Sequence, residues 1–294
     1  MTTDGQPPVT AGKVPVWRTA IESYGFVIAN LGRLLALSWP LMVIGAAAPI
    51  VGGRSVWGVE TLQHSPAYVV ANILFFVAGF AMYIVFVVRW HRFFLLDDRE
   101  SVFSEILAAR NRRFLGYFLL LNLTPFLPML IVVNIGFVVS IFGAGLPPEG
   151  VGTGLSVALF IIAWLPAFVL YFVFFRFSLV LPAAAFDRPI CLGESWHRLR
   201  GNTRRYKNAL TLVAIPTIIV GFILTVPFLP FLFARIQDGG LGPMTVRVGW
   251  MLVSIIFVIF GTAVWMTVLS TFYRHIVGMD APEGRDGDTA AGAA

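Results

Sequence analysis

The stretch VVRWHRFFLLDDRE contains the side chains that handle phosphate groups in many soluble enzymes. His91 lies between Arg89 and Arg92, and Asp97 and Asp98 follow after a short apolar run. Guanidinium groups bind oxyanions, and an imidazole near a carboxylate can transfer protons. A membrane phosphodiester or phosphatase site is therefore one interpretation of this stretch.

A second histidine-containing segment occurs later in the chain, where Asp187 precedes His197. If the two segments met in space, His91 and His197 would form one phosphate-handling pair with the nearby aspartates. However, no histidine shows a metal-ligand spacing such as HExxH, and no GxSxG, P-loop or dinucleotide fingerprint occurs. We therefore predict no catalytic residue, no metal and no cofactor. A membrane phosphodiester or phosphatase enzyme centred on His91 and His197 is kept as the third of three candidate functions.

The same residues fit the border of a membrane-spanning helix with fewer assumptions. Aromatic side chains gather at the interface between membrane and water, and Lys and Arg contact anionic headgroups there. We expect the following basic and aromatic side chains to lie at lipid headgroups: Arg89, Trp90, His91, Arg92, Arg176, Trp196, His197, Arg198, Arg204, Arg205 and Arg274.

The overall composition is that of a membrane protein. Of the 294 residues, 58% are hydrophobic and 12% are charged, whereas an average soluble domain has roughly 25% charged residues. Six stretches lack Asp, Glu, Lys and Arg over about 18 residues or more, enough for a helix to cross a bilayer. They do not alternate polar with apolar residues as barrel strands do. We predict an all-α bundle of six transmembrane helices, at about 34–51, 67–88, 114–141, 155–175, 209–233 and 248–272.

Lysine and arginine are distributed unevenly among the segments between these spans. Eighteen of the 21 lie in alternate segments, which include both ends of the chain, and three lie in the others. By the positive-inside rule, both termini are cytoplasmic. The net charge of +6 thus reflects membrane topology, and we predict membrane phospholipids, and no nucleic acid, as partners.

The predicted membrane domain covers residues 16–278. Residues 1–15 are polar and proline-rich, and 279–294 lack large apolar side chains after the first residue, so both ends are expected to be disordered. The first apolar run begins too late for a cleaved signal peptide. Cys191 is the single cysteine, which excludes an internal disulfide.

The two large cytoplasmic loops match each other. Asp98, Arg99 and Glu105 align without a gap with Asp187, Arg188 and Glu194, and each loop leads into a span with a proline. A weaker first copy surrounds Glu22. The pattern predicts three repeated helical-hairpin units, each beginning with an amphipathic helix that lies in the headgroup plane. In the first such helix, the apolar stripe contains Trp17, Ile21, Tyr24, Ile28 and Leu31.

An acidic residue recurs within each of these basic segments. We expect Glu22, Glu105 and Glu194 to form structural ion pairs with the arginines that end the spans, Arg89, Arg176 and Arg274, and so to hold each amphipathic helix against the bundle.

Prolines interrupt several spans, most clearly in VPFLPF of the fifth span. Broken helices form substrate sites in many transporters, although proline kinks are also ordinary in membrane helices. No ionisable group lies in the interior of a span, which argues against a proton-coupled or cation-coupled pump. A flippase-like carrier of an amphipathic or lipidic substrate remains the second alternative.

The segment FRFSLVLPAAAFDRPICLGESWHRLRGN resembles a poorly characterised family of six-span bacterial inner-membrane proteins. That family is similar to the membrane domain fused to some glycerophosphoryl diester phosphodiesterases. The resemblance implies an integral protein of the bacterial inner (plasma) membrane, near phospholipid metabolism. It carries no catalytic residue to this chain, because the phosphodiesterase activity belongs to a soluble domain without a counterpart here.

The first choice of function is therefore a non-enzymatic, lipid-associated scaffold or accessory in envelope or phospholipid homeostasis, with an unidentified membrane protein as a further partner. A sealed bundle core would favour the scaffold. A polar cavity that reaches the middle of the membrane would favour the carrier, and convergence of His91 or His197 with Asp97 or Asp187 would favour the enzyme.

Overall fold

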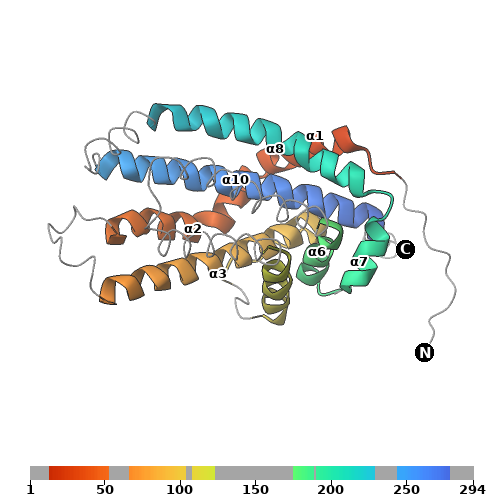
Figure 1. The fold of residues 1–294 in the computed structure, drawn as a ribbon, viewed down its shortest axis with the longest axis horizontal. Coiled ribbons are helices and arrows are strands. Elements are labelled where there is room, and N and C mark those ends of the chain that lie inside the picture. Colours follow the sequence, from red (N-terminus) through yellow and green to blue (C-terminus); the bar gives the residue numbers. More distant parts are fainter. Residues whose placement is uncertain are drawn as a thin grey trace, which may run out of the picture.

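A computed structural model describes residues 13–52, 66–103, 108–122, 175–188, 190–228 and 244–278, and all regular secondary structure in these residues is helical (Figure 1). The long helices are α2 (Leu31–Gly52), α3 (Pro66–Leu96), α8 (Thr203–Thr225) and α10 (Met244–Val277). The shorter elements are α1 (Val16–Ala29), the helix 109–122, η2 (Phe175–Phe177), α6 (Val180–Ala185), α7 (Leu192–Leu199) and η3 (Val226–Phe228).

Three described helices are long and apolar enough to cross a membrane: Ile73–Leu96, Thr203–Phe228 and Gly249–Val277. They correspond to the predicted second, fifth and sixth spans. A fourth candidate is the bent pair Val16–Ala29 and Leu31–Ala47. The predicted spans at 114–141 and 155–175 lie mostly outside the described residues. The protein is thus a helical membrane protein with three or four candidate spans in the part described.

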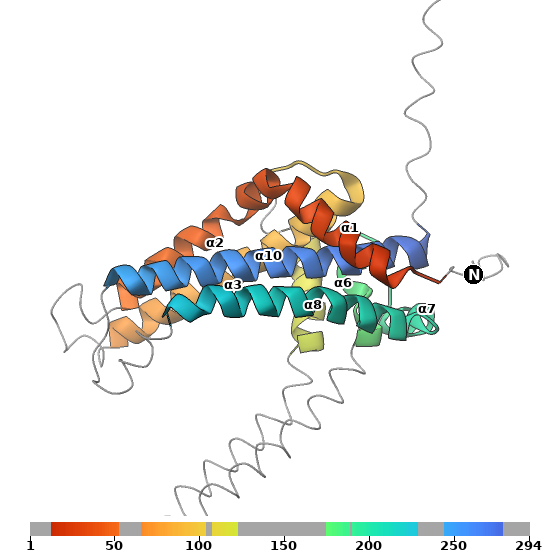
Figure 2. The same cartoon turned by 90° about the horizontal axis from the view of Figure 1, so that it is seen from above.

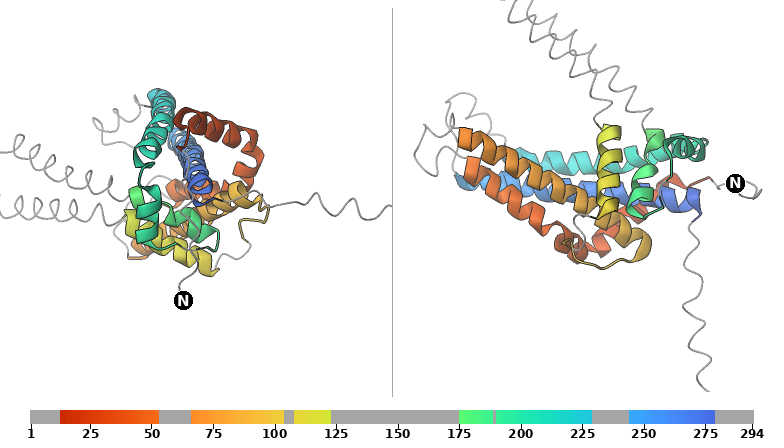
Figure 3. Two further views of the ribbon diagram at one scale, coloured as in Figure 1. Left: turned by 90° about the vertical axis from the view of Figure 1, so that its right-hand side faces the viewer. Right: turned by 90° about the horizontal axis from the view of Figure 1, so that it is seen from below.

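Helix α10 lies in the centre of this bundle. It packs against α1, α2, α3 and α8, as the end-on view shows (Figure 3). Tyr206 at the start of α8 packs on Phe272 near the end of α10, with ring centroids 5.0 Å apart. Near the end of α3, Trp90 donates hydrogen bonds to Ala263 and Thr267 of α10. The end of α3, the start of α8 and the end of α10 therefore share one end of the bundle, which we call the basic end.

Helix α1 precedes α2 along the bundle and meets it at a bend of 74° (Figure 2). Its inner face consists of Thr19, Ala20, Ser23 and Val27, and it packs against α8 and α10. Small side chains allow close helix packing in membranes. The predicted apolar stripe therefore faces mainly outward, and Trp17 is 65% exposed. The stripe exists, but most of it covers the outer surface of α1.

The segment directly after α3 differs from the amphipathic helix that the repeat pattern predicts at the start of the second unit. Residues 97–103 are not helical, and 104–107 lie outside the described residues. Asp97 has φ 53°, in the left-handed region, where a short polar side chain is tolerated and a helix ends. The aspartate pair therefore terminates α3. The third amphipathic helix does form, as α7.

Candidate functional site

The last two turns of α3 place Arg89, Trp90 and His91 inside the protein. Arg89 is 3% exposed, and Trp90 and His91 are fully buried. The sequence-based expectation that these three side chains contact lipid headgroups is wrong for them. The charge pattern placed the end of this span near residue 88. Helix α3 instead continues to Leu96, and its last turns pack against neighbouring helices.

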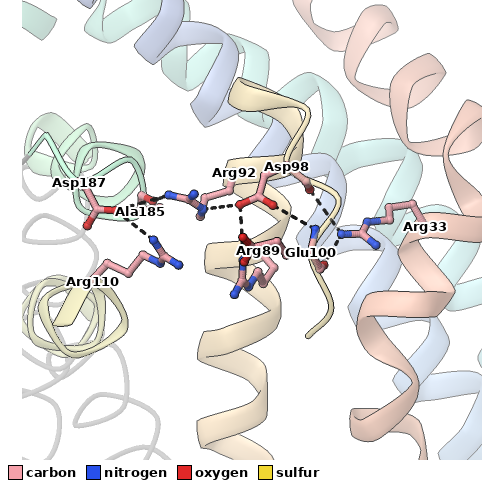
Figure 4. Close-up of polar contacts among 8 residues, drawn as sticks. All are labelled: Arg33, Arg89, Arg92, Asp98, Glu100, Arg110, Ala185 and Asp187. Atoms are coloured by element: carbon pink, nitrogen blue, oxygen red, sulfur yellow. Dashed lines mark hydrogen bonds and ion pairs between the residues drawn. The ribbon is translucent and has the colours of Figure 1, made fainter. Parts of the chain in front are cut away.

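Asp98 is the hub of a network of arginines and carboxylates, which we call the arginine network (Figure 4). The Oδ2 atom of Asp98 lies 2.7 Å from Nε of Arg92 and 3.4 Å from Nη1 of Arg89. Arg89 also lies 2.9 Å from Oε2 of Glu100. From α2, Arg33 donates to the main-chain oxygens of Asp98 and Glu100. The loop after α3 is thereby held to both α2 and α3.

The network continues to α6 and the helix 109–122 through Asp187. Arg92 Nη1 lies 3.5 Å from Oδ2 of Asp187, and Arg110 Nη1 lies 3.1 Å from the same oxygen. Arg92 also donates to the main-chain oxygen of Ala185 at the end of α6, where a helix favours a cation. Asp187 has φ 58°, like Asp97. Both loops therefore begin with a left-handed aspartate, which shifts the predicted alignment of the two loops by one residue.

The environment of Asp98 lowers the pKa of its carboxyl group. Burial alone would raise this pKa, but the hydrogen bond from the Glu100 main-chain N–H and the nearby Arg92 and Arg89 outweigh it. The carboxyl group thus remains ionised. A buried carboxylate of this kind holds the surrounding helices and loops together. The guanidinium groups of Arg89 and Arg92 already interact with carboxylates of the same chain.

His91 belongs to a polar seam between α3 and α10. Its Nδ1 shares a hydrogen bond of 2.6 Å with Oγ of Ser270, and its ring lies 5.9 Å from that of Phe114. Its buried Nε2 has no hydrogen-bond partner among the described residues. Tyr83 of α3 and Thr262 of α10 both line the cavity between these helices. The bond from His91 to Ser270 joins two membrane helices, as polar side chains commonly do.

The structure does not assemble the predicted histidine and aspartate site. His91 bonds to Ser270, whereas Asp97 pairs with Arg99 on the surface. Asp187 pairs with Arg92 and Arg110, and His197 is exposed on α7. Among the described residues, no group of three His, Cys, Asp or Glu side chains is placed to hold a metal ion.

The predicted glutamate pairs also differ from those observed. Glu22 pairs with Arg18 one turn away, and Glu194 pairs with Arg198 in the same way. Neither forms an ion pair with Arg89, Arg176 or Arg274, so these two predictions are wrong. Pairs one helical turn apart form without tertiary structure, which explains the preference. Glu105 lies outside the described residues.

Aromatic rings hold the remaining span-ending arginines. The guanidinium of Arg176 lies 4.3 Å from the ring centroid of Trp196, and that of Arg274 lies 5.2 Å from that of Phe94. Arg205 donates to the main-chain oxygen of Val14. The predicted headgroup residues that are exposed in the structure are His197, Arg198, Arg204 and Arg274.

A partly open cavity of 240 Å³ lies between α3, α8, α10, α6 and the helix 109–122. Its walls include Phe118, Trp265 and Met266, and its polar side chains include Asn122 and Ser178. Sequence reasoning did not find this cavity, because its residues are scattered over the chain and have no common motif. It also missed Arg33, Glu100 and Arg110, since their partners are far away in the sequence.

No family model, curated protein or solved structure matches this chain. The resemblance to the six-span inner-membrane family therefore stays a prediction.

Proposed function

We propose that this protein is a non-enzymatic integral membrane protein that binds membrane phospholipids and serves as a scaffold or accessory in envelope or phospholipid homeostasis. One observation carries the proposal. At the basic end, the exposed apolar face of α1 lies near exposed arginines that do not belong to the arginine network, among them Arg204 and Arg274.

The physical basis is the pairing of an apolar surface with exposed cations. The outward side chains Trp17, Ile21 and Ile28 suit the boundary between acyl chains and headgroups. Each Lys or Arg beside an anionic leaflet contributes on the order of 1 kcal/mol. Because the network arginines already interact with carboxylate and main-chain oxygens of the same chain, we assign headgroup binding to the exposed cations. We also propose an unidentified membrane protein as a partner.

The proposed topology has six spans in three repeated hairpin units, within a bacterial inner membrane and with both termini in the cytoplasm. The charge distribution supports it, since 18 of the 21 Lys and Arg residues fall on the side assigned to the cytoplasm. The left-handed aspartates Asp97 and Asp187, at equivalent places in the two loops, support the repeat.

Native mass spectrometry of the purified protein with phosphatidylglycerol or phosphatidylcholine tests the proposal. The variant Arg204→Gln/Arg274→Gln should bind about tenfold less phosphatidylglycerol, with little change for phosphatidylcholine. The matched control Arg204→Lys/Arg274→Lys keeps both charges and should bind as the original protein does. Equal loss in the lysine variant, or no loss in the glutamine variant, would refute headgroup binding by these charges.

The internal cavity is the observation that favours the second candidate, a carrier of an amphipathic or lipidic substrate. Its polar side chains lie between candidate spans, as a substrate site would require. Transfer of a fluorescent lipid between leaflets of vesicles that contain the protein would distinguish the carrier. A scaffold should not accelerate this transfer above that of protein-free vesicles.

A further inference from the structure

We propose that the internal cavity is a binding site for an uncharged lipid whose head carries a hydroxyl group, such as an acylglycerol or a long-chain alcohol. The proposal deepens the lipid association above, but it concerns a different part of the molecule. The exposed arginines of the basic end are not among the residues that line the cavity.

The position of the cavity fits a ligand that enters from the membrane. Tyr83, Tyr206 and Thr262 belong to the three candidate spans Ile73–Leu96, Thr203–Phe228 and Gly249–Val277. The wall contributed by α10 extends from Gly261 to Leu269, about 12 Å of helix at roughly 1.5 Å per residue. The cavity therefore extends from the basic end into the spans.

The chemistry of the lining selects an uncharged head. The residues that line the cavity in the described part of the chain include no Asp, Glu, Lys, Arg or His. A phosphate or ammonium group would lose its hydration there without a compensating charge, at a cost of several kcal/mol. A neutral head with an apolar chain avoids this cost.

The polar lining groups favour a hydroxyl on that head. Ser178 donates its hydroxyl hydrogen to the main-chain oxygen of Phe175, so the Oγ atom presents lone pairs. Asn122 donates from Nδ2 to the main-chain oxygen of Phe118, which fixes its carboxamide and directs its Oδ1 as an acceptor. Two acceptors on aromatic and aliphatic walls match a hydroxyl donor on an apolar body.

The volume limits how much of the ligand is enclosed. A cavity of 240 Å³ holds about eight groups the size of a water molecule, at roughly 30 Å³ each. This corresponds to a head and the first few carbons of one chain. The rest of the ligand would leave the cavity toward the bilayer, as expected for a lipid.

Photocrosslinking in the full-length protein in native membranes tests the proposal. Met266→p-benzoylphenylalanine places the probe in the cavity wall, and the same change at Phe222, which is exposed on α8, reports the surrounding lipid. The expected result is a neutral lipid adduct at Met266, enriched over Phe222 in the same membranes. Leu121 provides a second probe position if the Met266 variant does not fold.

Three outcomes would overturn the site. An adduct to a peptide from residues 123–174 would mean that the chain itself fills the cavity. A lipid profile identical to that at Phe222 would mean unselective contact. Labelling at Phe222 with none at Met266 and Leu121 would mean that no lipid enters.

A binding experiment in detergent identifies the head. A photoactivatable diacylglycerol should label the protein, and a photoactivatable phosphatidylglycerol should not compete at the cavity peptides. Asn122→Leu, which keeps the volume but removes the acceptor, should reduce diacylglycerol labelling about fivefold. Thr225→Val, on α8 outside the cavity, is the matched control and should leave it unchanged. Equal labelling of the cavity by both lipids would refute an uncharged ligand, while phosphatidylglycerol binding at the exposed arginines would remain a separate result.

Discussion

At the basic end, two adjacent aspartates form ion pairs of very different kinds. Asp98 is 8% exposed and contacts Arg89 and Arg92, whereas its neighbour Asp97 is 68% exposed and contacts Arg99. Two adjacent aspartates thus have different roles: Asp97 ends a helix with its backbone conformation, and Asp98 neutralises buried cations. Burial, and not the residue type, makes the difference.

Replacing the hub should therefore destabilise the protein. Asp98→Asn leaves two largely buried guanidinium groups with weaker partners, and we expect a loss of about 2 kcal/mol in unfolding free energy. Arg89 keeps Glu100 and Arg92 keeps Asp187, which limits the loss. The measurement is thermal or denaturant unfolding in detergent.

The matched control is Asp97→Asn. Asparagine tolerates the left-handed conformation of this position, and the exposed pair with Arg99 contributes little, so the change should stay within about 0.5 kcal/mol. If both variants lose the same stability, the proposed role of Asp98 as a hub is wrong.

The lowered pKa of Asp98 predicts a pH dependence of stability. Because the folded pKa lies below the unfolded value of about 3.9, the ionised carboxyl stabilises the folded state above that pH. This stabilisation should disappear as the pH falls through the folded pKa. The melting temperature of the original protein should therefore approach that of Asp98→Asn as the pH falls below about 4. A difference between the two that does not shrink as the solution is acidified would contradict the prediction.

At the scale of elements, helices pack through small side chains and polar seams. Close contact of α8 with α10 depends on Gly221, where a Cβ atom would lie 2.5 Å from Cζ of Phe257. Trp90 and His91 join α3 to α10 by hydrogen bonds. In a bilayer, where lipid is as apolar as the side chains, such contacts replace the hydrophobic effect as the cause of helix association.

A larger residue at Gly221 should push α8 away from α10. Gly221→Val should cost about 1–3 kcal/mol of stability because the new side chain overlaps the Phe257 ring. Gly25→Val is the control, since a Cβ there has no neighbour within 4 Å. Adding Phe257→Ala to Gly221→Val should restore part of the loss, and unfolding in detergent measures all three. No rescue would show that the contact with Phe257 is not the cause.

At the scale of the whole molecule, the proposed orientation can be tested with the single cysteine. Cys191 is exposed beside α7, on the side assigned to the cytoplasm. A maleimide that cannot cross membranes should label it in inside-out vesicles and not in intact cells. Glu149→Cys in a Cys191→Ser background should show the opposite pattern, because its segment has no Lys or Arg. Labelling of Cys191 in intact cells would mean that the protein has the opposite orientation in the membrane.

The sequence by itself determined that this is a helical membrane protein, because charge-free stretches of sufficient length have no other stable form in a bilayer. It located three of the candidate spans, with ends that differ by one to eight residues from those in the structure, and it found the apolar stripe of α1 from its spacing. Periodicity and the distribution of charge are local properties of the chain, so both can be recognised without knowledge of the fold.

Only the tertiary structure decided which charges are buried and which are free. Arg89 and Arg204 are both basic residues at a span border, yet one lies in the arginine network and the other is exposed. Glu22 and Glu194 form ion pairs with arginines one helical turn away. The turn that begins at Asp97 brings Asp98 to its arginine partners. The cavity likewise arises from residues distant in sequence. Pairing energy depends on burial and distance in three dimensions, and neither follows from spacing along the chain.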